Sequence, residues 1–162
     1  MRKKTNKLSY SGEKRTGAIK HKVEKKTVIT TDSTSGYYDK NPCWMFQRCD
    51  FDHPKWGMLC NASELTNVFK YLAHLEKLKW GEILTVTSGR RSNTRNHHVE
   101  LVDLVKDAQK RAVEINVDEF DSVCSIAIEG QKRVWGHISD GIFYIIWFDM
   151  HHEIYPYEKR NT

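Results

Sequence analysis

The sequence predicts an α+β fold in which two amphipathic helices pack on a small antiparallel sheet that ends in a three-strand meander. Three observations lead to this fold class. Two segments have apolar residues at helical spacing, three later segments have the composition of strands, and turn residues separate those strands. At 162 residues and 39% hydrophobic content, the chain is long enough for one compact domain and too short for two ordinary ones.

Residues 1–41 predict a basic, largely disordered tail before a single domain over residues 42–162. The tail has almost no apolar periodicity and is rich in Lys, Thr, Ser and Gly, so it cannot offset the entropy lost on ordering. Residues 1–26 hold ten Lys or Arg against two Glu, a net charge of +8. Because the whole chain has a net charge of +5, the rest carries −3. The basic surplus that would attract a nucleic acid therefore lies in the tail.

The predicted domain begins with a short strand and a helix. Residues 42–51 place aromatic and apolar side chains among polar ones, which favours a strand, and Pro54 would stop it. Asn61-Ala-Ser-Glu64 has the form of a capping box, the usual start of a helix. The apolar residues that follow at helical spacing are Leu65, Val68, Phe69, Leu72 and Leu75.

A polar loop over residues 88–96 carries Arg90, Arg91 and Arg95, and we expect these arginines to reach a ligand. A second helix is predicted from about His98 to Ile115, with apolar side chains on one face. His98 would then lie at the helix N-terminus, which favours anions.

Three strands are predicted after this helix, over residues 123–128, 132–138 and 142–148. Glu129-Gly130 and Ser139-Asp140-Gly141 separate them as turns. In the second strand, alternation places Arg133, Trp135 and His137 on one face. There the arginine could pair with a phosphate while the indole stacks on a base. The alternative is that Trp135 belongs to the core and Arg133 pairs with a carboxylate.

The third strand ends in four polar side chains, Asp149, His151, His152 and Tyr155. Strand ends expose reactive groups yet hold them rigidly. Histidine titrates near neutral pH, and a carboxylate beside it can orient its ring. Asp149, His151 and His152 could instead bind a metal, or the histidines could be solvated surface.

Cysteine usage and the absence of apolar spans indicate a soluble, cytoplasmic protein that does not contact a membrane. No run of about 20 apolar residues is present, and the N-terminus opens with charges. The four cysteines are therefore expected to be reduced. Cys43, Cys49, His53 and Cys60 lack the tight CxxC pair that most structural zinc sites use, so we predict no metal, with zinc as the minor alternative.

Residues 133–136 (Arg-Val-Trp-Gly) and residues 143–156 resemble the C-terminal signature of small uncharacterised bacterial proteins. That signature is an arginine-tryptophan-glycine strand followed by a strand that ends in tryptophan, aspartate, proline, a spacer and histidine; Met150 stands in place of the proline. The order of two helices before an antiparallel meander also resembles toxins of the RelE/ParE type from toxin-antitoxin modules.

The resemblance implies a toxin, of a toxin-antitoxin or defence module, that cleaves messenger RNA with or without the ribosome and is held inactive by an antitoxin protein. Toxins of this type generally work without a metal, and we expect no cofactor. Chemistry then suggests roles for single residues: Arg133 for transition-state charge, His152 and His98 as acid and base, Asp149 to orient them, and Trp135 or Tyr155 as a stacking platform. The remaining candidate substrate-binding residues are His151, Arg90, Arg91 and Arg95.

Two other functions are alternatives on the sequence alone. One is a non-enzymatic module that binds a nucleic acid or a protein through the basic tail and an aromatic sheet face. The other is a metal-dependent hydrolase built on Asp149, His151 and His152. The net charge of −3 on the predicted domain weighs against the nuclease, because nucleases of this size usually present a strongly basic groove.

Overall fold

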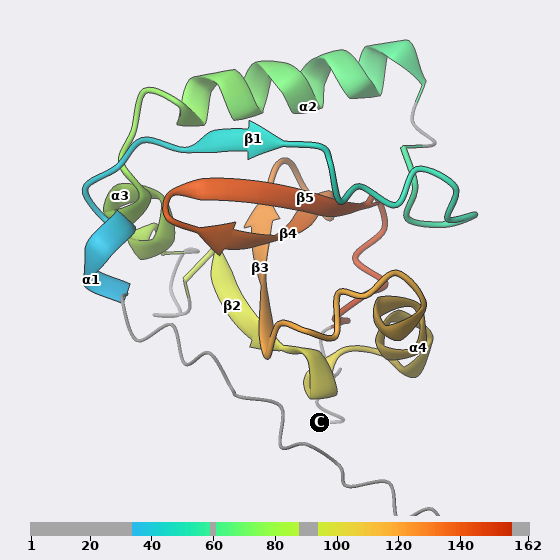
Figure 1. Cartoon of the computed structure of the whole chain (residues 1–162). Helices are drawn as coiled ribbons and strands as arrows, with labels where there is room; N and C mark the ends of the chain where they lie inside the picture. Colours follow the sequence, from blue (N-terminus) through green and yellow to red (C-terminus); the bar gives the residue numbers. More distant parts are fainter. Residues whose placement is uncertain (1–33, 59–60, 88–93, 157–162) are drawn as a thin grey trace, which may run out of the picture. The chain divides into compact units, whose positions relative to one another are not determined.

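The computed structural model of the chain describes residues 34–58, 61–87 and 94–156, which form a mixed five-stranded sheet with helices on both faces (Figure 1). The strands are β1 (Cys43–Met45), β2 (His97–Glu100), β3 (Ser122–Ala127), β4 (Arg133–Ser139) and β5 (Ile142–Asp149). The helices are α1 (Thr34–Tyr37), α2 (Ala62–Leu75), α3 (Trp80–Thr85) and α4 (Lys106–Glu114), with a 3₁₀ turn over Leu101–Asp103. The α+β class is therefore confirmed.

The sheet has the order β1-β5-β4-β3-β2, and the strand at one edge, β1, runs in a direction that was not predicted. The predicted meander of β3, β4 and β5 is antiparallel, as expected. However, β1 pairs with β5 in parallel, from Cys43 opposite Ile142 to Met45 opposite Tyr144. The expectation of a wholly antiparallel sheet is wrong because no tight turn links β1 to β5, so no local signal fixes their relative direction.

The predicted first helix is confirmed as α2, and its cap forms as the sequence indicates. The Asn61 side chain accepts a hydrogen bond from the backbone N–H of Glu64 at 3.0 Å, and its amide donates to the Glu64 carboxylate at 3.1 Å. The helix buries Val68, Leu72 and Leu75. None of the helices in the described part of the chain combines the length and apolar character needed to cross a bilayer.

The predicted second helix is wrong in its first half. His97–Glu100 form β2, which pairs antiparallel with β3, and α4 begins only at Lys106. Val99 alternates with exposed neighbours and is buried, which is the pattern of a half-buried strand. Gln109 stabilises the segment between β2 and α4, because its side-chain amide donates to the carbonyls of Val102 and Leu104 at 2.7 Å each. The helix α3 was not predicted.

Each face of the sheet has its own hydrophobic core. The first core lies between one face and α2 with α3, and Trp80, Phe143 and Phe148 are its largest fully buried side chains. The second core lies between the other face and α4, and it contains Trp135 and Trp147. Both faces of β5 are buried, as predicted for a central strand.

A bulge in β5 opposite Gly136 aims two consecutive side chains at the second core. Trp135 is opposite Trp147 and Gly136 is opposite Ile145, so Ile146 is the extra residue. Ile146 and Trp147 both belong to the second core. The next turn is a two-residue hairpin in which Asp140 and Gly141 have φ of 52° and 88°. These positive angles match the turn type that the right-handed twist of a hairpin favours.

The domain begins earlier than the predicted boundary at residue 41. Residues 34–37 form α1, and Tyr37 and Tyr38 pack against the first core. The Asn41 amide donates to the carbonyls of Glu76 and Leu78 at 3.0 Å each. The sequence did not predict these contacts, because tyrosine and asparagine side chains make them and the segment lacks the aliphatic residues that indicate a core. The rest of the predicted tail, including its basic half, lies outside the described residues.

Candidate functional site

Four side chains from three separate segments lie around the end of the sheet where β4 begins and β5 ends, and we call them the strand-end cluster. They are His97 on β2, Arg133 on β4, and His152 and Tyr155 in the segment after β5. The rings of His97 and Tyr155 lie edge to face, with centroids 6.3 Å apart. Burial lowers the pKa of both imidazoles, and the charge of Arg133 contributes to the lowering. The sequence predicted all of these residues except His97.

Asp149 stabilises the segment that contains His152 and Tyr155. Its carboxylate is fully buried and accepts three backbone N–H groups: His151 at 3.2 Å and Glu153 at 2.9 Å on Oδ1, and Ile154 at 3.0 Å on Oδ2. The predicted role of orienting a histidine ring is therefore replaced by one of shaping the loop. Three donors on one carboxylate fix the path of residues 150–154.

His152 is held in a backbone conformation that non-glycine residues rarely adopt. Its φ is 58°, in the left-handed region, and it lies at the tip of the loop that Asp149 binds. Burial lowers the pKa of the half-buried imidazole below its ordinary value of 6.5, and the charge of Arg133 lowers it further. The ring is thus neutral at physiological pH and can accept a proton.

His97 has the same electrostatic character. Burial is the main cause that lowers the pKa of its imidazole, and the charge of Arg133 adds to the effect. Arg133 itself is half-buried and donates from Nη1 to the carbonyls of Gly130 and Lys132 at 2.9 Å each. These bonds hold the guanidinium at the start of β4. Asp149, on the neighbouring strand β5, is the cross-strand partner of Arg133.

His98 does not join the cluster. It was predicted at a helix N-terminus, but it lies in β2, where successive side chains point to opposite faces. Its Nε2 is 3.3 Å from the hydroxyl of Tyr37, on α1. Its neighbour His97 lies in the strand-end cluster, where His98 was predicted. The alternation of residues 97–100 would have indicated this if the segment had been interpreted as a strand.

Trp135 cannot serve as a stacking platform on the surface, because only 1% of it is exposed. It packs in the second core, which was the alternative interpretation of its position on β4. Its indole ring therefore separates two polar regions on the same strand. One is Arg133 in the strand-end cluster, and the other is His137 in a surface pocket.

The other predicted substrate-binding residues are Arg90, Arg91, Arg95 and His151. Arg90 and Arg91 lie outside the described residues. Arg95 is exposed, and its guanidinium donates to the Ile128 carbonyl at 3.3 Å. His151 is exposed beside the cluster.

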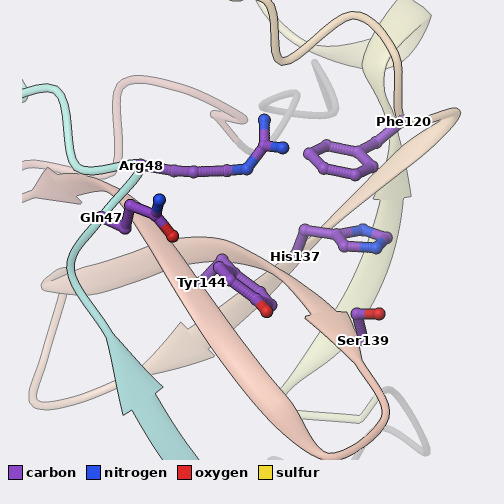
Figure 2. Close-up of a pocket in the computed structure, with 6 residues that line it drawn as sticks. All are labelled: Gln47, Arg48, Phe120, His137, Ser139 and Tyr144. Atoms are coloured by element: carbon purple, nitrogen blue, oxygen red, sulfur yellow. The ribbon is translucent and has the colours of Figure 1, made fainter.

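A pocket that the sequence did not predict lies on the other side of Trp135, and we call it the aromatic pocket (Figure 2). It has a volume of about 390 Å³ and is lined by Gln47, Arg48, Phe120, His137, Ser139 and Tyr144. The rings of Phe120 and His137 are stacked, with centroids 3.8 Å apart and planes 10° apart. On the same Phe120 ring, the Arg48 guanidinium carbon lies 5.1 Å from the centroid.

A partly buried ion pair fixes the loop between β1 and α2 to α4. The Arg111 guanidinium binds both carboxylate oxygens of Asp50 at 2.7 Å, and the Trp147 indole donates to the same carboxylate at 3.2 Å. These hydrogen bonds from Arg111 hold the pKa of the Asp50 carboxyl below its ordinary value. A second cavity of about 370 Å³ lies beside this pair, between residues 52–56 and α4.

The zinc alternative receives no support from the described residues. Burial raises the pKa of the Cys49 thiol to about 12, so it resists the deprotonation that metal binding needs. His53 Nδ1 already accepts the backbone N–H groups of Lys55 and Trp56 at 3.2 and 3.0 Å. Cys60 lies outside the described residues. Among the residues that the structure places, no three His, Cys, Asp or Glu side chains are grouped to hold a metal.

We expect stability to fall as the pH drops below about 6.5. Burial lowers the pKa of four half-buried imidazoles, those of His53, His97, His137 and His152. In the unfolded chain these groups take up protons near their ordinary pKa of 6.5, whereas in the folded protein they stay neutral to lower pH. The unfolded state therefore binds more protons in this window. Urea unfolding at pH 7.5, 6.5 and 5.5 should give a midpoint that decreases with pH, and an unchanged midpoint would contradict this.

No family model, no curated protein and no solved structure matches this chain.

Proposed function

We propose that this protein is a metal-independent endoribonuclease that cleaves messenger RNA, and that it acts as the toxin of a toxin-antitoxin or defence module. The observation that carries the proposal is the strand-end cluster. Two imidazoles with lowered pKa values lie within the electrostatic reach of one arginine, and a tyrosine ring packs against one of them. This combination supplies the three functions that metal-free RNA cleavage needs, which are a base, an acid and a cation.

The proposed chemistry assigns one step to each residue. His152, neutral at physiological pH, accepts the proton of the ribose 2′-hydroxyl as its oxygen attacks the adjacent phosphorus. Arg133 stabilises the negative charge that gathers on the phosphorane. His97 donates a proton to the departing 5′ oxygen, which leaves a cyclic 2′,3′-phosphate and a 5′-hydroxyl.

The acid role of His97 requires that its imidazole carry a proton in the complex. In the free protein, burial and the charge of Arg133 both oppose protonation. A bound phosphodiester brings a negative charge that partly cancels the effect of Arg133, so the pKa of one imidazole should rise when RNA binds. Tyr155, whose ring contacts that of His97, would stack on a base next to the cleaved bond.

The charge distribution of the chain divides binding from chemistry in this proposal. Residues 1–26 carry a net charge of +8 and would hold RNA by releasing counterions, while the rest of the chain carries −3. The expected partners are RNA, with or without the ribosome, and an antitoxin protein that covers the cluster.

The test is RNA cleavage by purified protein and by a His152→Gln variant. Wild type should cleave single-stranded messenger RNA in the presence of a chelator, and His152→Gln should be at least about 100-fold slower because it loses the base. Arg133→Met should show a loss of similar size. Rates from single-turnover assays, with circular dichroism to confirm folding, measure the effect.

Glu153→Gln is the control, because Glu153 is the residue after His152 and its side chain is exposed. It should cleave at the rate of the wild type. Intact RNA with the wild type, or equal rates for wild type and His152→Gln, would overturn the proposal. Expression in bacteria gives an independent measure, since wild type should arrest growth and His152→Gln should not.

A non-enzymatic RNA-binding module is the second candidate, and the aromatic pocket is the observation that favours it. It would bind RNA as tightly as the nuclease but leave it intact in every variant. A metal-dependent hydrolase on Asp149, His151 and His152 has less support, because three backbone N–H groups already occupy the Asp149 carboxylate.

A further inference from the structure

We propose that the aromatic pocket binds one unpaired nucleobase of an RNA strand. The inference rests on the proposed function for its substrate class, but the pocket is a separate site from the strand-end cluster. Its lining comes from the segment after β1, the loop before β3, and the strands β4 and β5 (Figure 2). A cavity of about 390 Å³ is within the size range of small-ligand sites.

One wall of the pocket is made by three neighbouring planar groups. The Arg48 guanidinium carbon lies 5.1 Å from the Phe120 ring centroid, and the centroid of the His137 imidazole lies 3.8 Å from it. The His137 and Phe120 planes are only 10° apart. Planar side chains held in this way form a flat surface, which is how proteins recognise splayed-out RNA bases.

Tyr144 lines the pocket beside His137. It is the cross-strand partner of His137, so the two side chains project from the same face of the sheet, and Figure 2 shows both among the residues that line the pocket. Its ring is only partly buried, so part of it faces the cavity. Stacking on such rings tolerates any base, because every base has a π-face.

The charges around the pocket favour an uncharged ligand over a phosphate. Arg48, the cation of the lining, already forms an ion pair with the Glu119 carboxylate. Burial lowers the pKa of the His137 imidazole, which is therefore neutral at physiological pH. A phosphate would need an unpaired cation, whereas the neutral ring of a base does not.

The polar groups of the lining match the edge of a base. Gln47 offers an amide with donors and an acceptor, and both Ser139 and Tyr144 offer hydroxyls that can do either. Gln47 and Ser139 are exposed at the rim, where the edge of an inserted base would lie. The pocket therefore combines flat walls with hydrogen-bonding groups of both kinds.

The pocket and the strand-end cluster face the same side of β4. Arg133 and His137 are four residues apart on one strand, so their Cα atoms are separated by about 13 Å. The cluster would act on the RNA backbone, while the pocket would bind a base a short distance along the same strand. The base bound in the pocket, which lies some distance along the strand from the cut bond, would then influence where the RNA is cleaved.

The test is titration of the full-length protein with uridine, adenosine, their 5′-monophosphates and inorganic phosphate, followed by the NMR signals of the His137 and Tyr144 rings. Nucleosides and monophosphates should shift these signals and saturate, and phosphate should not. Tyr144→Leu and Phe120→Leu should weaken nucleoside binding by roughly 5- to 150-fold, because each removes a stacking surface. Phe51→Leu is the matched control, because Phe51 is 50% exposed and is not part of the lining.

Gln47→Ala and Ser139→Ala alter only exposed rim positions, so they test the pocket even if the aromatic variants unfold. Both should weaken the binding of uridine and adenosine by a few-fold, because each removes a hydrogen-bonding group at the rim. Saturation by inorganic phosphate alone, or no nucleoside-induced shift in the wild type, would overturn the inference.

His152→Gln separates the two proposals: it should lose cleavage and keep nucleoside binding. Binding without cleavage by the wild type would refute only the nuclease, and cleavage without nucleoside binding would refute only the pocket.

Discussion

Replacing Asp149 with alanine should lower the free energy of unfolding by about 3–5 kcal/mol and abolish RNA cleavage. The carboxylate is 0% exposed and accepts the backbone N–H groups of His151, Glu153 and Ile154. Removing it leaves these donors without their acceptor, one of them in the protein interior, and each lost bond to a charged group costs about 1.5–3 kcal/mol before the loop relaxes. His152 would then leave its left-handed conformation, so the cluster would lose its base. Urea unfolding and cleavage assays measure the two effects.

Asp149→Asn gives a graded comparison. Its single side-chain oxygen can still accept from His151 and Glu153, but its NH₂ group cannot accept from Ile154. The loss of stability should be about half that of Asp149→Ala. Glu153→Ala is the control, because this side chain is exposed in the same loop. If Asp149→Ala were as stable as Glu153→Ala, the loop would not depend on the carboxylate.

Gly136→Ala should destabilise the protein by about 3–5 kcal/mol or prevent folding. An added Cβ would lie 2.3 Å from Phe143 Cε1 and 2.4 Å from the carbonyl oxygen of Tyr144. The second contact is with the backbone of the neighbouring strand, which cannot move without breaking the bulge that directs Ile146 and Trp147 into the second core. Soluble expression and urea unfolding measure the loss.

Gly130→Ala is the matched control for a glycine in this part of the sheet. Gly130 has a φ of 54°, and nothing lies within 4 Å of an added Cβ. Only backbone strain then opposes the substitution, at a cost of about 1–2 kcal/mol. If the two variants were equally stable, the close approach of β5 to Gly136 would not limit the fold.

The parts of the fold that the sequence predicted correctly are those with local signals. The helix α2 has its cap and its apolar face within 15 residues, and the meander has strands separated by Gly-containing turns. The direction of β1 depends on a partner about 100 residues away, so no local pattern encodes it. The segment that became β2 was misinterpreted because its apolar residues are too few to separate a period of two from one of 3.6.

The candidate site was predicted only where its members are close in the sequence. His152 and Tyr155 were recognised from the polar end of one strand, and Arg133 from its neighbour. His97 joins them through β2, whose pairing the sequence did not reveal. The aromatic pocket was missed for the same reason, because Arg48 and Phe120 are 72 positions apart and become neighbours only through the fold.

Asp149 was recognised as a functional candidate, but its role was misjudged. A carboxylate beside two histidines suggests catalysis, yet the same carboxylate is the simplest acceptor for the backbone of a tight loop. Sequence alone does not separate these uses. The burial of the side chain separates them, since a fully buried carboxylate with three donors has little capacity left for a substrate.

The parallel edge strand has a consequence for the order of folding. β1 and β5 are paired over only three residues, and this pairing closes a loop of about 100 residues. Loop closure of that length is entropically costly, so the local hairpins of the meander should form first and β1 should dock late. Gln47 and Arg48 lie in the segment after β1, whereas the members of the strand-end cluster lie on β2, on β4 and after β5. Local opening of this edge would therefore dismantle the pocket while the cluster stays intact.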